Sequence, residues 1–87
     1  MDPSPIVVLN AIVAQSYLGK ADVALAALRD LESRSSLESY LPFRAAEADL
    51  LRRSGDAAAA ARAYTQAEEL AGTEMERDFF RRRREAL

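Results

Sequence analysis

The chain has 87 residues and a formal net charge of −2, which is the size of one small domain. With 49% hydrophobic and 30% charged residues, it is expected to fold rather than to stay disordered. It contains no cysteine and no histidine, which excludes disulfides and thiolate metal sites and removes the usual general base at neutral pH. We therefore predict no enzyme, no metal site and no cofactor.

The first predicted helix covers residues 5–18. Ser4 suits the position before a helix and Pro5 suits its first position, because the proline nitrogen has no hydrogen to leave unpaired. Gly19 follows the last turn, where a left-handed glycine commonly ends a helix. A second helix is predicted over residues 21–33. One of its faces carries the apolar side chains of Val23, Ala24, Ala27, Leu28 and Leu31.

Three further helices are predicted in the second half of the chain. They cover residues 41–53, residues 57–71 and a last segment from Thr73 to near the C-terminus. Residues 36–40 are either a loop or an extra turn. Thr73 with Glu76 three residues later fits a capping box. In the last helix we expect Met75, Phe79 and Phe80 to pack on the preceding helix, while Arg77, Arg81 and Arg84 face water. No segment alternates β-branched and polar residues, so no strand is predicted.

An internal repeat relates the two halves of this arrangement. The string Gly-Lys-Ala at residues 19–21 and the string Gly-Asp-Ala at residues 55–57 are offset by 36 positions. The unit is a helix, a glycine turn and a helix, close to the 34 residues of a tetratricopeptide repeat. Ala24, Ala60 and Ala63 supply small residues where antiparallel helices cross. The pattern predicts one all-α domain over residues 1–87, with two tetratricopeptide-like antiparallel hairpins and a C-terminal capping helix in a right-handed stack. The alternative is a generic pair of helical hairpins.

The first predicted helix is apolar on nearly all sides. Ile6, Leu9, Val13 and Tyr17 form one stripe, and such a helix is usually buried on more than one side. Something is therefore expected to cover it: a preceding helix, a partner protein or a second copy of the chain.

A second set of candidate residues lies where the first helix of each repeat would face a concave groove. Such a groove can hold a peptide, and the alternative is ordinary surface polarity. These residues are Asn10, Asp49, Arg52 and Arg53. Together with the apolar stripe they give the predicted protein-binding residues: Ile6, Leu9, Asn10, Val13, Tyr17, Asp49, Arg52 and Arg53.

The four consecutive arginines at residues 81–84 are the most basic feature of the chain. Residues 73–87 contain five arginines and four acidic residues, so the segment is nearly balanced. We interpret it as a solvated helix face near a C-terminus, where cations favour the helix dipole, and expect no direct nucleic-acid binding. The longest strongly apolar run, residues 6–9, is far too short to span a membrane, and the start of the chain lacks a basic leader. A soluble, cytoplasmic protein is predicted.

Several ordered segments resemble a known family. They are SPIVVLN at residues 4–10, ADLLRRSG at 48–55, AAAARAY at 58–64, ELAGTEMER at 69–77 and FFRRRR at 79–84. Together they resemble the tetratricopeptide-like C-terminal domain of a subgroup of bacterial extracytoplasmic-function sigma factors. Ala11 stands where that family often has an arginine, so no role of that arginine carries over.

The resemblance implies a regulatory domain in transcription initiation. In that family the promoter-reading and polymerase-binding domains lie upstream, and the C-terminal extension modulates them. The implied partners are those upstream sigma domains or RNA polymerase. The alternative is a freestanding tetratricopeptide-like adaptor, or a module that forms a homodimer through its first helix.

Overall fold

The computed structural model describes residues 4–87, and within them the chain is all-helical, as predicted, with no strand. Met1, Asp2 and Pro3, on which the expectation about a leader rests, lie outside the described residues. The five helices of the described chain are α1 (Pro5–Ser16), α2 (Ala21–Arg34), α3 (Leu41–Ser54), α4 (Ala57–Leu70) and α5 (Glu74–Glu85).

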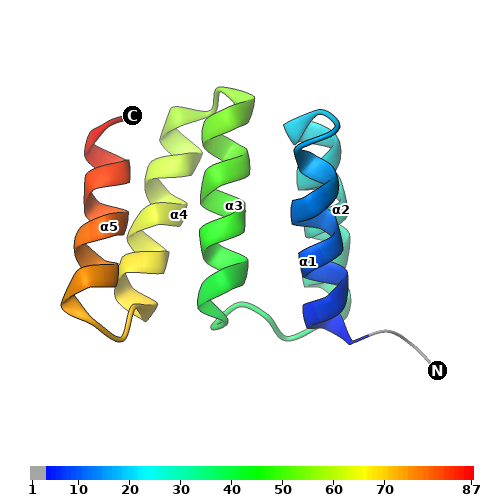
Figure 1. Cartoon of the computed structure of the whole chain (residues 1–87), viewed down its shortest axis with the longest axis horizontal. Coiled ribbons are helices and arrows are strands. Elements are labelled where there is room, and N and C mark those ends of the chain that lie inside the picture. The colour runs from blue at the N-terminus through cyan, green and yellow to red at the C-terminus, as the bar shows by residue number, and fades with distance from the viewer. Residues whose placement is uncertain (1–3) are drawn as a thin grey trace.

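The helices stand side by side in a row, with α1 and α2 at one end and α5 at the other (Figure 1). Helix α3 packs most extensively against α4 and also contacts α2, whereas its contact with α1 is slight. Among the helices of residues 4–87, α5 packs only against α4. Helices α1 and α3 begin 36 residues apart, and so do α2 and α4, which is the offset of the sequence repeat.

Side-chain caps explain where three of the helices begin. The Ser4 hydroxyl accepts a hydrogen bond from the backbone N–H of Ile6 at 3.3 Å, as its position before Pro5 predicted. The Thr73 hydroxyl accepts one from the backbone N–H of Glu76 at 3.1 Å and donates one to the Glu76 carboxylate at 3.0 Å. Asp56 caps α4 by accepting from the backbone N–H of Ala59 at 3.1 Å. Each cap satisfies an N–H group that has no partner inside its helix.

The glycine turns differ from each other. Gly55 ends α3 with a φ of 92°, in the left-handed region, as predicted for the turn between hairpin helices. The same prediction for Gly19 is wrong, since Gly55 is the only residue with positive φ in residues 4–87. Helix α1 ends at Ser16 rather than at residue 18. There the N–H groups of Tyr17 and Leu18 bond the carbonyls three residues earlier, in a tighter turn.

Residues 36–40 are a connecting loop with one turn, in which the N–H of Tyr40 bonds the carbonyl of Leu37 at 3.0 Å. Leu37 itself is buried and anchors this connection to the core. The other helix ends differ from the predicted ones by one residue, and the chain follows the predicted order throughout.

The buried side chains form two adjoining clusters. The first joins α1, α2 and α3 through larger residues: Leu9, Ile12, Ala24, Leu28, Leu31, Leu37, Phe43 and Leu50. The second joins α3, α4 and α5 and is rich in alanine: Ala48, Leu51, Ala60, Ala63, Tyr64, Ala67, Ala71 and Phe80. The predicted small residues Ala24, Ala60 and Ala63 are all buried, and the small side chains let neighbouring helices approach closely.

The apolar face of α2 is buried only in part, and the prediction that Met75 and Phe79 of α5 pack on α4 is wrong. Val23 and Ala27 are exposed, because α2 turns Ala24, Leu28 and Leu31 into the core and nothing in residues 4–87 covers its adjoining edge.

In α5, Phe80 is 6% exposed, but Phe79 is 50% and Met75 is 83% exposed. Successive helical residues point about 100° apart, and a helix that packs against one neighbour buries one stripe only. Arg84 does not simply face water either, since its guanidinium bonds the Glu68 carboxylate at 2.7 Å and the Thr65 hydroxyl at 3.1 Å.

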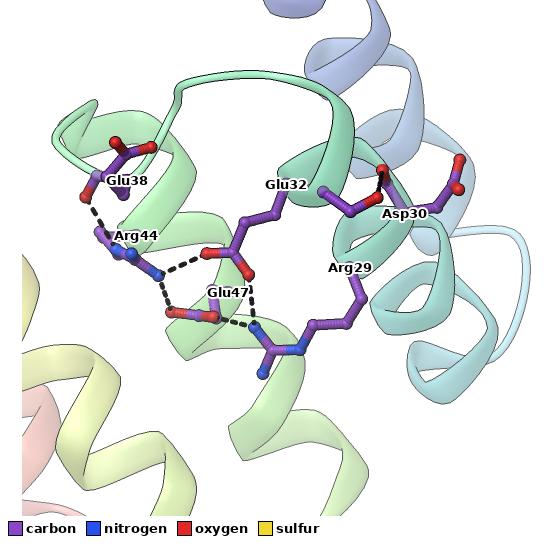
Figure 2. Close-up of polar contacts among 7 residues, drawn as sticks. Arg29, Asp30, Glu32, Glu38, Arg44 and Glu47 are labelled. Carbon is purple, nitrogen blue, oxygen red and sulfur yellow. Dashed lines mark hydrogen bonds and ion pairs between the residues drawn. The ribbon is translucent and has the colours of Figure 1, made fainter.

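A network of ion pairs joins α2 to α3 on the side shown in Figure 2. Glu47 of α3 is 4% exposed and pairs with Arg29 of α2 and with Arg44 one turn away, the latter at 3.0 Å. Arg44 also bonds the Glu32 carboxylate at 3.2 Å and the backbone carbonyl of Glu38 at 3.0 Å. The buried carboxylate thus has two cationic partners, which offset its loss of hydration.

Candidate binding groove

A groove of about 380 Å³ runs across one face of the molecule and is bordered by α1, α3 and α5. These are the first helix of each hairpin and the terminal helix, with one residue of α4 at the base. The lining residues are Leu9, Asn10, Val13, Tyr17, Pro42, Ala45, Ala46, Asp49, Tyr64, Phe79, Phe80 and Arg83.

The hollow exists because α3 presents small side chains between larger ones. Ala45 and Ala46 face the groove from α3, while aliphatic and aromatic side chains approach from α1 and α5. Tyr64 and Phe80 are buried and form part of its base. The interior is therefore apolar, and polar groups are confined to a few positions around it, which is typical of a site that binds side chains of a ligand.

Helix α1 and the residue that caps its C-terminus, Tyr17, line the groove with four of the predicted residues. Leu9, Val13 and Tyr17 recur at four-residue spacing, and Asn10 lies next to Leu9. Leu9 is 1% exposed and belongs to the core with Leu28 and Leu50, so a ligand would meet it only at the base of the groove. Val13 is half-buried, whereas Asn10 and Tyr17 are exposed.

Ile6, the remaining residue of the predicted apolar stripe, is exposed on α1 but does not line the groove. Within α1, Leu9, Ile12 and Ser16 are buried, and Ile6 and Val7 are exposed. Tyr17 and Leu18, in the turn that follows, are exposed as well. Helix α2 therefore packs against one side of α1. The apolar residues on the other side of α1 are exposed to solvent in the described chain.

The three predicted residues of α3 lie together but have different roles. Asp49 lines the groove and accepts a hydrogen bond from Arg52 at 2.6 Å. Arg53 approaches Asp49 at 3.6 Å and makes its shorter bonds to α1, with one guanidinium nitrogen 2.6 Å from the Ser16 carbonyl oxygen. Its guanidinium also stacks on the Tyr17 ring, 5.1 Å from the centroid. Arg53 is thus a link between helices as well as a neighbour of the groove.

The charge on Arg52 is secured by its surroundings. The hydrogen bond that Arg52 donates to the Asp49 carboxylate, and to a smaller extent its interaction with the Tyr64 hydroxyl, raise the pKa of Arg52 above its ordinary value. The pair Asp49–Arg52 is partly exposed, so it is worth little to stability in water. Its consequence is electrostatic: beside the apolar groove the chain holds a fixed carboxylate with a guanidinium on its outer side.

Several lining residues were not singled out from the sequence. Pro42, Ala45 and Ala46 had no signal beyond their position on α3, and Tyr64 had none beyond its position on α4. Phe79 and Arg83 come from the last helix, where the Arg83 guanidinium lies over the Phe79 ring, 5.1 Å from the centroid. Their spacing of four residues was the available signal, since it places a cation over an aromatic ring on one helix face.

Within residues 4–87, no three Asp or Glu side chains gather closely enough to hold a metal ion. None of the described helices combines the length and the apolar character that a membrane span needs.

Comparison with known proteins gives no relationship from which to assign the groove. No protein-family model, no curated protein and no solved structure matches this chain.

Proposed function

We propose that this chain is a non-catalytic protein–protein interaction domain of the bacterial cytoplasm. In this proposal its hairpins are tetratricopeptide-like and stack in a right-handed sense, and α5 caps the stack. The equal spacing of helix starts, 36 residues in both hairpins, supports the repeat. The resemblance of the sequence to the C-terminal extension of extracytoplasmic-function sigma factors supports a regulatory role in transcription initiation.

The observation that carries the proposal is the groove between α1, α3 and α5. It has an apolar base, a carboxylate at Asp49, an amide at Asn10 and a guanidinium at Arg83. A peptide segment with apolar side chains on one side would bury them at the base and hydrogen-bond to this polar rim. The upstream sigma domains or RNA polymerase are the partners that we propose for it.

Docking in this scheme uses two neighbouring surfaces of the same helix. The groove side of α1, with Asn10, Val13 and Tyr17, contacts the bound segment. The outer side, where Ile6 and Val7 are exposed, lies against the body of the partner. Because both surfaces belong to α1, binding is expected to order this helix, whose contact with α3 is slight.

The test is a titration of the chain with the separate upstream domains of an extracytoplasmic-function sigma factor, followed by calorimetry. Asn10→Arg places a long cation in the groove and should weaken binding at least tenfold. Gln66→Arg is the matched control, because Gln66 is an exposed residue of α4 that lies outside both docking surfaces and does not line the groove. Equal weakening by both variants, or no binding by the unmodified chain, would count against the proposal.

The exposed apolar residues of α1 favour one alternative, a freestanding adaptor that self-associates through its first helix. Val7 is 58% exposed, so its side chain is accessible to a second copy. Helix α1 contains no acidic or basic residue, so no ion pair would orient the two copies. This alternative predicts a dimer that dissociates when Val7 is replaced by glutamate.

A further inference from the structure

A second exposed surface lies on α5, on the side that no other described helix covers. It consists of Met75, Asp78, Phe79, Arg82 and Arg83, which we call the outer stripe of α5. The stripe surrounds a shallow hollow of about 360 Å³, to which only residues of α5 contribute. In Figure 1, α5 forms one end of the row of helices, and its packing is confined to α4.

The charges of α5 are ordered along the helix. The first half contains three acidic residues, Glu74, Glu76 and Asp78, and one arginine, Arg77, whereas the second half contains the arginines at residues 81–84 and one acidic residue, Glu85. Phe79 lies near the midpoint of the helix, half exposed, between these two halves. Within the outer stripe, Asp78 precedes Phe79, and Arg82 and Arg83 follow it, so the stripe is complementary to itself when a second copy runs in the opposite direction.

We propose that the outer stripe of α5 binds the same stripe of a second copy of this chain, with the two helices antiparallel. A two-fold axis near Phe79 then brings the acidic half of each helix opposite the basic half of the other. A parallel arrangement would instead place like charges together. The symmetric contact closes on itself, so it gives a dimer rather than a filament.

The residues of the stripe fit this arrangement in detail. Phe79 of each copy fills the hollow of the other, and the Met75 side chain meets the apolar stem of Arg83 across the interface. Asp78 already bonds Arg82 one turn away at 2.7 Å, and Arg82 is 77% exposed, so it is free to reach a second carboxylate. In the dimer, Asp78 of one copy and Arg82 of the other form two symmetric ion pairs.

The contact is small, because one helix of 12 residues meets another. Interfaces well below the size of a standard protein–protein contact are weak, so we expect dissociation at micromolar concentrations and a dimer in concentrated solution. Exposed ion pairs are screened by salt, and the association should weaken as ionic strength rises.

Charge reversal provides a test that folding defects cannot imitate. Asp78→Arg makes both positions of the pair basic, and Arg82→Glu makes both acidic, so each variant should be monomeric by sedimentation equilibrium at a concentration where the unmodified chain is a dimer. An equimolar mixture of the two variants restores both ion pairs and should form a heterodimer with at least a tenfold gain in association over either variant alone. Circular dichroism should give unchanged helix content for both.

The matched control is Val7→Glu, which introduces a charge on the exposed side of α1 and should leave the dimer intact. The proposal is overturned if the unmodified chain stays monomeric at millimolar concentration, or if mixing the two α5 variants restores nothing. It is also overturned if Val7→Glu abolishes a dimer that Asp78→Arg leaves unchanged, since the first helix is then the interface. Phe79 and Arg83 belong to both the stripe and the groove, whereas Asn10 lines the groove alone, so Asn10→Arg tests binding of sigma-factor domains separately from the dimer.

Discussion

Arg53 of α3 donates a hydrogen bond from its guanidinium to the backbone carbonyl of Ser16, at the C-terminal end of α1, with a separation of 2.6 Å. A second guanidinium nitrogen lies 3.1 Å from the Ser16 hydroxyl, and the charged plane stacks on Tyr17. The carbonyls at the end of a helix lack partners within the helix, and a cation there also interacts favourably with the helix dipole. Since α1 otherwise contacts α3 slightly, this pair fixes one border of the groove.

Replacement of Arg53 by alanine should therefore loosen α1 more than the rest of the chain. We expect a loss of about 1–2 kcal/mol in the free energy of unfolding, because the Ser16 groups lose a charged donor. Hydrogen exchange should accelerate in α1 first. Arg52→Ala is the control, since the ion pair of Arg52 is with the partly exposed Asp49 on its own helix and not with α1. Equal acceleration of exchange in α1 by both variants would contradict the assigned role of Arg53.

The ion-pair network between α2 and α3 makes a second prediction. Glu47→Ala leaves Arg44, whose side chain is 12% exposed, without its buried carboxylate partner. We expect a loss of roughly 2 kcal/mol, less than for a fully buried pair because the Arg29 side chain is half exposed. Chemical denaturation measures this loss in the free energy of unfolding. Glu38→Ala should change stability little, because Arg44 bonds only the backbone carbonyl of Glu38.

The two hairpin turns should respond differently to alanine. Gly55→Ala forces a side chain into a left-handed conformation and should cost about 1–2 kcal/mol, even though the space around it is open. At Gly19 the φ angle is not positive, and an added Cβ would contact only the Gln15 carbonyl oxygen, at an ordinary 3.7 Å. The Gly19→Ala variant should therefore unfold at the same temperature as the unmodified chain or at a slightly higher one. A similar destabilisation by both would mean that the two turns share one backbone conformation.

Adjacent phenylalanines on α5 give the sharpest contrast in burial. Phe80→Ala empties a site in the alanine-rich cluster and should destabilise the chain by about 3 kcal/mol or more. Phe79→Ala should cost well under half of that, measured in dilute solution where the proposed dimer is dissociated. If the two variants unfold at the same denaturant concentration, Phe80 is not the main contact of α5 with α4.

The sequence determined the order of the helices and much of how they begin and end, because these features depend on residues close together in the chain. The cap at Ser4, the Thr73–Glu76 pair and the glycine turn after α3 are local: each satisfies backbone groups or relieves backbone strain within a few residues. The 36-residue repeat could also be predicted from the sequence, because similar glycine-containing strings recur at that spacing. For the candidate site, the sequence supplied Leu9, Asn10, Val13, Tyr17 and Asp49 among the lining residues.

Only the tertiary structure decided which face of each helix is covered. Val23, Met75 and Phe79 are as apolar as their buried neighbours, yet they are exposed because no other described helix lies over them. The same reason explains why the contribution of α5 to the groove, and the pairing of Arg53 with Ser16 across 37 positions, were not foreseen. Periodicity reveals that a helix has an apolar stripe, whereas the positions of its neighbours determine how much of that stripe is removed from water.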